Sequence, residues 1–272
     1  MSDDTQLTID GSALDDDLTI ETSGRVIRPF NRMIGEVVDE YKLKATDDGL
    51  HVRAVDAPNV MYVDATLPAS ELNTLSIDGD ETAIGVSTDG FARAISDARY
   101  GKSTDDPVTL TADGATLETV VDREYADVPA TVTDRAELID PAALRSQPDV
   151  IDVDRVSFPL PPDAFIDVVS SFTDSKHISI RVTEGGIVTF GGKTDTHARE
   201  IELDVDADTD GVAETVFSRS HLQNIASGLK TGYAESATLH VKDDFPLTVN
   251  CKTEQDLQVE YTVAPRVSRD AP

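Results

Sequence analysis

The chain has 272 residues, enough for two domains with ordinary cores. It carries 52 acidic against 23 basic residues, a formal net charge of −29, and no tryptophan. Such an acidic, lysine-poor composition resembles that of proteins that work in molar salt, where the Debye length is about 3 Å. No apolar run is long enough to cross a membrane or to act as a signal sequence. We therefore expect a cytoplasmic protein.

Residues 1–16 are polar and acidic, and they predict an N-terminal extension. Beyond them, apolar residues at helical spacing predict helices at 28–40, 87–100, 163–173 and 219–229. Alternating apolar residues predict strands at 18–22, 42–46, 50–55, 60–67, 108–112, 115–123, 128–133, 177–183, 186–192, 198–205, 236–242, 245–252 and 256–263. Two helices and many antiparallel strands in each half predict an α+β fold, with the helices on one face of a sheet.

The two halves of the chain resemble each other. Phe30, Met33, Ile34 and Val37 have counterparts 135 residues later in Phe165, Val168, Val169 and Phe172. A second match, with an offset of 131, pairs Ser87 and Phe91 with Ser218 and Leu222. We interpret this as an internal duplication, which gives two similar domains.

A proline-rich segment, residues 136–162, separates the two halves. Its five prolines argue against a helix or an interior strand and favour an extended connector. The predicted organisation is an extension at 1–16, a first domain at 17–135, a connecting loop at 136–158, a second domain at 159–267 and a tail at 268–272. The loop also carries apolar residues such as Leu144 and Val150, so we expect something to cover it.

Sites for chemistry are not evident. The five histidines are scattered singly, and the lone cysteine, Cys251, excludes a disulfide and a multi-cysteine zinc site. The acidic run 206–211 opens like a calcium loop, but Phe217 stands where the bidentate glutamate would be needed. We predict no metal, no cofactor and no enzymatic activity. A hydrolase that uses some of the many carboxylates is a remote alternative.

Charge is distributed unevenly. The windows 28–40, 87–102, 161–176 and 218–233 hold eight basic and eight acidic residues, so the whole net charge lies elsewhere. One interpretation is a shared helix face that tolerates a polyanion, with basic residues placed for phosphate contacts. The other is that helices packed on sheets simply carry fewer charges of either sign. The first interpretation predicts a set of phosphate-contacting residues consisting of Arg28, Arg32, Arg93, Arg99, Lys102, Lys176, Arg219 and Lys230.

Three segments resemble one known family. The run 50–60, LHVRAVDAPNV, is similar to the characteristic strand and loop of the archaeal and eukaryotic sliding clamp, proliferating cell nuclear antigen (PCNA). Residues 138–141 and 147–150 resemble its interdomain connecting loop. Residues 244–247 and 261–267 resemble its last hairpin and C-terminus. The resemblance covers residues 17–267 in consistent order.

The resemblance implies a non-catalytic, homotrimeric ring whose helices surround duplex DNA and which serves as a processivity factor. The eight basic residues of the helix windows would then be its DNA-facing set. Neighbouring subunits would join through strand edges at 115–121 and 186–192. A DNA polymerase, the clamp loader, a flap nuclease and a ligase would dock through short peptides, inserted as a helical turn into a groove. Carried over position by position, the groove residues are Val55, Asn59, Val60, Tyr62, Pro148, Val150, Ile151, Pro246, Ala264 and Pro265.

Three features depart from the family pattern. The connecting loop reads PDVI at 148–151, without the proline that usually follows the second apolar position. The helices carry fewer basic residues than usual, and the extension at 1–16 has no counterpart. A divergent or virus-borne clamp would fit these departures. A different class of function also stays open, namely a monomeric acidic decoy or DNA mimic that sequesters clamp partners. Oligomeric state distinguishes a ring from a decoy.

Overall fold

The computed structural model describes residues 18–101, 104–145, 154–205 and 212–266. The predicted extension, the tail and four predicted site residues lie outside this range. These four residues are Lys102, Pro148, Val150 and Ile151.

One unit of a strand, a helix and three further strands occurs four times along the described chain. The first half contains β1 (Leu18–Ser23), α1 (Gly24–Gly35), β2 (Glu40–Thr46), β3 (Gly49–Val55), β4 (Met61–Pro68), an additional β5 (Thr74–Ile77), β6 (Glu81–Ser87), α2 (Thr88–Ala94), β7 (Pro107–Asp113), β8 (Thr116–Tyr125) and β9 (Val128–Glu137). The second half contains β10 (Val156–Pro159), α3 (Pro162–Ser170), β11 (His177–Val182), β12 (Ile187–Lys193), β13 (Ala198–Asp204), β14 (Ala213–Ser218), α4 (Arg219–Thr231), β15 (Ala234–Val241), β16 (Leu247–Thr253) and β17 (Gln258–Val263). The predicted α+β class is confirmed.

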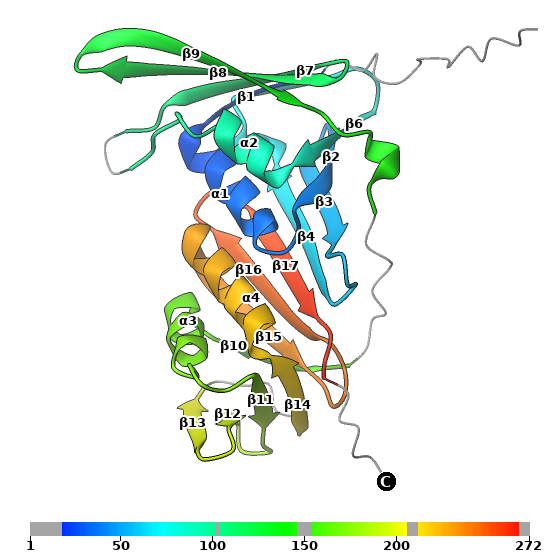
Figure 1. Ribbon diagram of the computed structural model, residues 1–272, viewed down its shortest axis with the longest axis vertical. Coiled ribbons are helices and arrows are strands. Elements are labelled where there is room, and N and C mark those ends of the chain that lie inside the picture. Colours follow the sequence, from blue (N-terminus) through cyan, green and yellow to red (C-terminus); the bar gives the residue numbers. More distant parts are fainter. Residues whose placement is uncertain (1–17, 102–103, 146–153, 206–211, 267–272) are drawn as a thin grey trace, which may run out of the picture.

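Three antiparallel sheets carry the fold. The largest has eight strands in the order β10-β15-β16-β17-β4-β3-β2-β6, so strands of the two halves meet where β17 pairs with β4. A five-stranded sheet (β5-β1-β7-β8-β9) and a four-stranded sheet (β13-β12-β11-β14) lie at opposite ends. The helices lie along one side of the molecule in the order α2, α1, α4, α3 (Figure 1). The repeated unit thus places all four helices on a common face.

The bounds of the first two helices differ from the predicted ones, and for α1 the cause is a contact with residues distant in the sequence. Helix α1 begins at Gly24, not Arg28, because distant residues satisfy its first N–H groups: Gly24 donates to the Asp106 carbonyl at 3.0 Å, and Arg25 to the Asp105 carboxylate at 2.9 Å. It ends at Gly35, so the prediction of helix up to residue 40 was wrong. Helix α2 ends at Ala94, shorter than predicted.

The predicted subunit edges were also wrong. Strand β8, which contains residues 116–121, pairs with β7 on one side and with β9 on the other. Strand β12 likewise pairs with both β11 and β13. Neither strand has a free side for a neighbour. The outer strands of the two end sheets are β5 and β9 in one and β13 and β14 in the other (Figure 1). The sequence pattern predicted β9 and β13 as strands but could not show that they lie at sheet edges.

The connecting segment is partly anchored. Strand β9 runs to Glu137, two residues beyond the predicted end of the first domain. The N–H of Ile139 then donates to the carbonyl of Gly85 of β6 at 2.9 Å in an antiparallel bridge, and Asp140 caps the short 3-10 turn Pro141–Ala143. Leu138 packs against the core. The domain division itself stays a prediction.

Candidate nucleic-acid interface and partner groove

The exposed stripe of α1 is made of arginines. Val26, Ile27, Phe30, Met33 and Ile34 face the core and are buried. Between them, the three partly exposed charged side chains are Arg25, Arg28 and Arg32, which recur at helical spacing, and the helix contains no acid. In a chain of net charge −29, this helix is a local concentration of positive charge. The predicted DNA-facing set included Arg28 and Arg32 but missed Arg25. Arg25 lies three residues before Arg28, and this helical spacing could have placed it on the same face.

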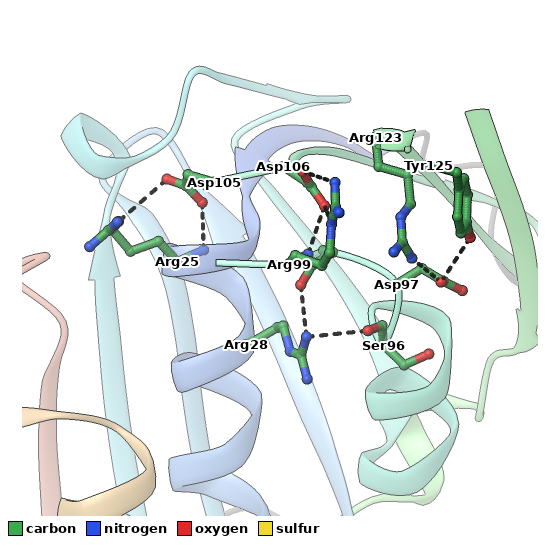
Figure 2. Close-up of polar contacts among 10 residues, drawn as sticks. Arg25, Arg28, Ser96, Asp97, Arg99, Asp105, Asp106, Arg123 and Tyr125 are labelled. Carbon is green, nitrogen blue, oxygen red and sulfur yellow. Dashed lines mark hydrogen bonds and ion pairs between the residues drawn. The ribbon is translucent and has the colours of Figure 1, made fainter. Parts of the chain in front are cut away.

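All three of these arginines are held in place by neighbouring groups. Arg25 donates to the carbonyl oxygen of Gly101 at 2.5 Å, and its Nε lies 3.5 Å from the carboxylate of Asp105 (Figure 2).

Arg28 and Arg32 are held as well. Arg28 donates to the carbonyl oxygens of Ser96 at 3.2 Å and Ala98 at 2.7 Å, beyond the end of α2 (Figure 2). Its guanidinium lies 5.5 Å from the ring centroid of Tyr100, and Arg32 donates to the Tyr100 hydroxyl at 3.0 Å. Burial and the neighbouring Arg32 lower the pKa of Arg28. The guanidinium groups are therefore fixed side by side on the helix face.

Arg99, another residue of the predicted DNA-facing set, serves the fold. Its Nε lies 2.9 Å from the largely buried carboxylate of Asp106, and its backbone N–H donates to the same oxygen at 2.9 Å (Figure 2). Burial alone would raise the pKa of Asp106, but the bonds from Arg99 outweigh it and the pKa is lowered. This pair closes the loop that caps the start of α1.

The remaining predicted basic residues are spread along the row. Arg219 donates to the carbonyl of Thr173 at 2.8 Å, so it too braces the chain. Arg93, Lys176 and Lys230 are exposed. Helix α3 instead presents Asp163 and Asp167 to solvent. The helix face is therefore most positive at α1 and acidic at α3, rather than uniformly basic.

The described residues of the predicted partner groove converge at one end of four neighbouring strands. Val55 ends β3, Tyr62 lies at the start of β4, Ala264 follows β17 and Pro246 precedes β16. Because these strands are adjacent and antiparallel, their ends meet there: Val55 pairs with Tyr62, and Tyr62 with Thr262. Asn59, Val60 and Pro265 lie in the adjoining segments.

The loop between β3 and β4 is braced by Asp56. One oxygen of its carboxylate accepts the N–H groups of Val60 at 2.7 Å and Met61 at 3.0 Å. Asn59 adopts a left-handed conformation with φ of 57°, which asparagine tolerates better than most residues. The N–H of Ala264 then donates to the carbonyl of Val60 at 2.9 Å. The C-terminal segment and this loop thus form a single wall.

A hollow of about 540 Å³ adjoins this wall. It is lined by residues 37–40 after α1, by residues 55–58, and by Ala143, Leu144 and Arg145 of the connecting segment. Of the predicted groove residues, Val55 is among its lining residues. Sequence reasoning missed the contribution of Val37 and Val38, because segments about a hundred residues apart meet here and leave no local pattern.

Several proteins of known name are similar in sequence to this chain over most of its length. A protein of Natronomonas pharaonis named DNA polymerase sliding clamp is 29% identical over 248 residues, which cover 87% of this chain and 93% of that protein. A protein of the same name from Halobacterium salinarum is 27% identical over 245 residues, covering 86% and 92%. The chain belongs to the PCNA family of DNA polymerase sliding clamps.

Solved structures show that the clamp has the family's fold. The clamp of Archaeoglobus fulgidus, bound to the C-terminal region of FEN-1, superposes with a TM-score of 0.79 at 23% identity, covering 93% of this chain and all of that one. PCNA of Thermococcus kodakaraensis gives a TM-score of 0.79 at 20% identity and covers 92% of this chain. No family model matches the chain.

The predicted family is thus confirmed, and it is a family of non-catalytic clamps. Within the described residues of this clamp, no group of three or more potential metal ligands is gathered. The same part of the chain contains no helix long and apolar enough to cross a membrane. Cys251 is buried, and burial raises the pKa of its thiol to about 12, so the thiol stays protonated at neutral pH.

Proposed function

We propose that this clamp closes into a homotrimeric ring around duplex DNA, with its row of helices lining the hole. The observation that carries the proposal is the position of β9 and β13. Each is an outer strand of one of the two sheets at opposite ends of the molecule, and the helices lie on the side between them (Figure 1). Pairing β9 of one subunit with β13 of the next would join one open edge of each sheet, whose other outer strands are β5 and β14, and would leave the same face of every subunit directed inward.

The charges on these edges predict how such a ring responds to salt. Strand β9 contains Asp134, Arg135 and Glu137, a net charge of −1, and β13 contains one arginine and three acids, a net charge of −2. Arg135 is already paired with Glu118 of its own subunit at 2.5 Å. Joining two acidic edges is unfavourable in dilute buffer and becomes less so when salt screens the repulsion.

We further propose that DNA polymerase, the clamp loader, a flap nuclease and a ligase dock through short peptides at the predicted groove. The bound FEN-1 segment of the Archaeoglobus clamp supports this mode of recognition. The convergence of four strand ends at Val55, Val60, Tyr62 and Ala264 offers an apolar wall for a peptide anchor. Arg25, Arg28 and Arg32 would face the phosphates of the encircled duplex.

Light scattering after size exclusion tests the ring. A trimer in 2 M KCl that dissociates in 0.1 M KCl is expected. Glu202→Gln on β13 should shift dissociation to lower salt, because it removes one charge from an acidic edge. Asp47→Asn, an exposed change in the β2–β3 turn, is the matched control and should shift nothing. A monomer at every salt concentration would favour the decoy, and a trimer that is tighter in 0.1 M KCl would contradict this role of the edge charges.

A further inference from the structure

Tyr233 is exposed and held in an unusual backbone conformation. It follows α4 after Gly232, its φ is 56°, and 60% of its surface is accessible to solvent. A bulky side chain in the left-handed region is an outlier that costs free energy, and glycine or asparagine would fit better. Such strain concentrates at functional sites. The strained backbone of Tyr233 therefore indicates that its exposed ring has a function.

The ring of Tyr233 belongs to a cluster drawn from three distant segments. It packs edge-on against Tyr100, with the ring centroids 5.9 Å apart. Tyr100 is in turn held by Arg32 through a hydrogen bond and by Arg28 over its ring. Burial and the adjacent Tyr233 hydroxyl raise the pKa of Tyr100, so the Tyr100 hydroxyl is protonated at physiological pH. The two tyrosines therefore extend the arginine stripe of α1 without adding charge.

A hollow of about 330 Å³ lies beside this cluster. Its lining includes Arg25, Pro29, Tyr100 and Tyr233 together with Glu235 and Glu254. The two carboxylates make the hollow itself unfavourable for a phosphate, whereas the arginines attract phosphates along α1. Tyr100 and Tyr233 line the hollow, and Tyr100 also contacts Arg28 and Arg32, so the two rings offer an uncharged surface beside the arginines.

An uncharged contact with DNA is useful to a protein that works in high salt. Each phosphate contact made by a charged side chain weakens with salt, with a slope of about −0.9 in log affinity against log salt concentration. The composition of this chain is that of a protein suited to molar salt, and the helix face offers few basic residues. A tyrosine ring or hydroxyl releases no counterion when it contacts DNA, so its contribution persists when ionic contacts are screened.

We propose that Tyr233 is a nucleic-acid contact of this clamp, touching the sugar–phosphate backbone of duplex DNA beside the phosphates that the α1 arginines face. The proposal rests on the proposed function, because it requires DNA to pass along the row of helices. It assigns to the clamp a contact whose strength does not depend on salt, placed where the two halves of the subunit meet.

The test compares Tyr233→Gly with the parent in binding a fluorescent 40-base-pair duplex that carries bulky blocks at both ends. Because a closed ring cannot thread onto a blocked duplex, subunits dissociated in 0.1 M KCl are mixed with the duplex and then brought to 0.5, 1 or 2 M KCl, so that rings close around it. Glycine suits a φ of 56°, so this variant should unfold at a higher temperature than the parent. Its affinity for the duplex should nevertheless fall about fivefold, or about 1 kcal/mol, at all three salt concentrations. Lys230→Gln should instead reduce the salt slope by about 1.

Ala126→Gly is the matched control, since Ala126 also has a positive φ of 51° but lies at the tip of the β8–β9 hairpin. It should gain stability and bind the duplex as the parent does. Equal binding by Tyr233→Gly and the parent would overturn the proposal, and so would a loss that disappears at 2 M KCl. If the parent itself failed to bind the blocked duplex, the proposed encirclement would fail first, so the two failures are distinguishable.

Discussion

The buried hydroxyl of Tyr261 donates a hydrogen bond of 3.0 Å to the main-chain oxygen of Met33, 228 residues earlier in the chain. Tyr261 lies on β17 and Met33 on α1, so the bond ties the second half of the subunit to the first. The space around it is tight: a Cβ at Gly228 would clash with the Tyr261 hydroxyl, and one at Gly232 with Met33. The joint between the halves is thus a packed core rather than a flexible linkage.

Removing that hydroxyl should weaken the joint. Tyr261→Phe leaves the carbonyl of Met33 buried without this donor, and we expect a loss of about 1 kcal/mol in the free energy of unfolding. Chemical denaturation in 2 M KCl measures it. Tyr125→Phe, a change at an exposed ring, should cost less than about 0.5 kcal/mol. Equal stabilities of the two variants would contradict the structural role of the Tyr261–Met33 bond.

A carboxylate pair crosses the same joint on β17 and β4. Glu260 lies directly opposite Asp64, which also contacts Arg53 at 3.1 Å. Burial, and then the charge of Asp64, raise the pKa of Glu260, and burial raises that of Asp64. A raised carboxyl pKa means that the folded state binds more protons than the unfolded chain. Stability should therefore decrease as the pH rises through these raised pKa values.

Glu260→Gln removes the unfavourable charge and should raise the melting temperature at pH 7 in 2 M KCl. It should also flatten the dependence of stability on pH between about pH 4 and pH 7. Thermal unfolding monitored by circular dichroism over this range is the measurement. Glu184→Gln, in the exposed β11–β12 turn, serves as the control. A parent protein whose stability rises steadily with pH across that window would show that the pair does not act as described.

The wall formed by the β3–β4 loop and the C-terminal segment can be tested as a docking site by burying a charge in it. Val60 is partly buried against the core and lies next to Ala264. Val60→Asp should weaken the binding of a polymerase C-terminal peptide by at least about 2 kcal/mol, because the carboxylate would be covered without a partner. Calorimetric titration in 2 M KCl measures the affinity, with thermal unfolding run on the same sample to check that the variant is folded.

The control for that substitution is Val212→Asp, which places the same charge at a valine that is 55% exposed. It should change the peptide affinity by less than about 0.5 kcal/mol. If Val60→Asp stayed folded and bound the peptide as tightly as the parent, the wall formed by the β3–β4 loop and the C-terminal segment would not be the docking site.

Features of this clamp that could be predicted from the sequence are local or repeated. The apolar spacing around Phe30 and Phe165 predicted two of the four helices, and the run 50–60 pointed to the family. The start of α1 could not be predicted, because Asp105 and Asp106 cap it from about 80 residues away. Strands β5, β6, β10 and β14 were missed. Two of them, β5 and β10, have four residues each, but β6 and β14 are as long as the predicted strands β2 and β11.

The site was predictable to a smaller extent. Helical charge counting pointed to all four helix windows together and did not single out α1. It also could not show that the guanidinium groups of Arg99 and Arg219 donate hydrogen bonds to Asp106 and Thr173. Strand order is likewise a tertiary property. A sequence places β8 and β9 one after the other, but only their pairing shows that β9, and not β8, is the outer strand.

Retention on circular DNA tests the central claim most directly. Subunits dissociated in 0.1 M KCl are mixed with a nicked circular plasmid, brought to 2 M KCl so that rings close, and passed over a gel-filtration column. The same plasmid, linearised beforehand and left without end blocks, is treated in parallel. We predict that the clamp elutes with the circle and is lost from the linear DNA, because a closed ring slides off a free end. Equal retention on both forms, or retention on neither, would contradict encirclement.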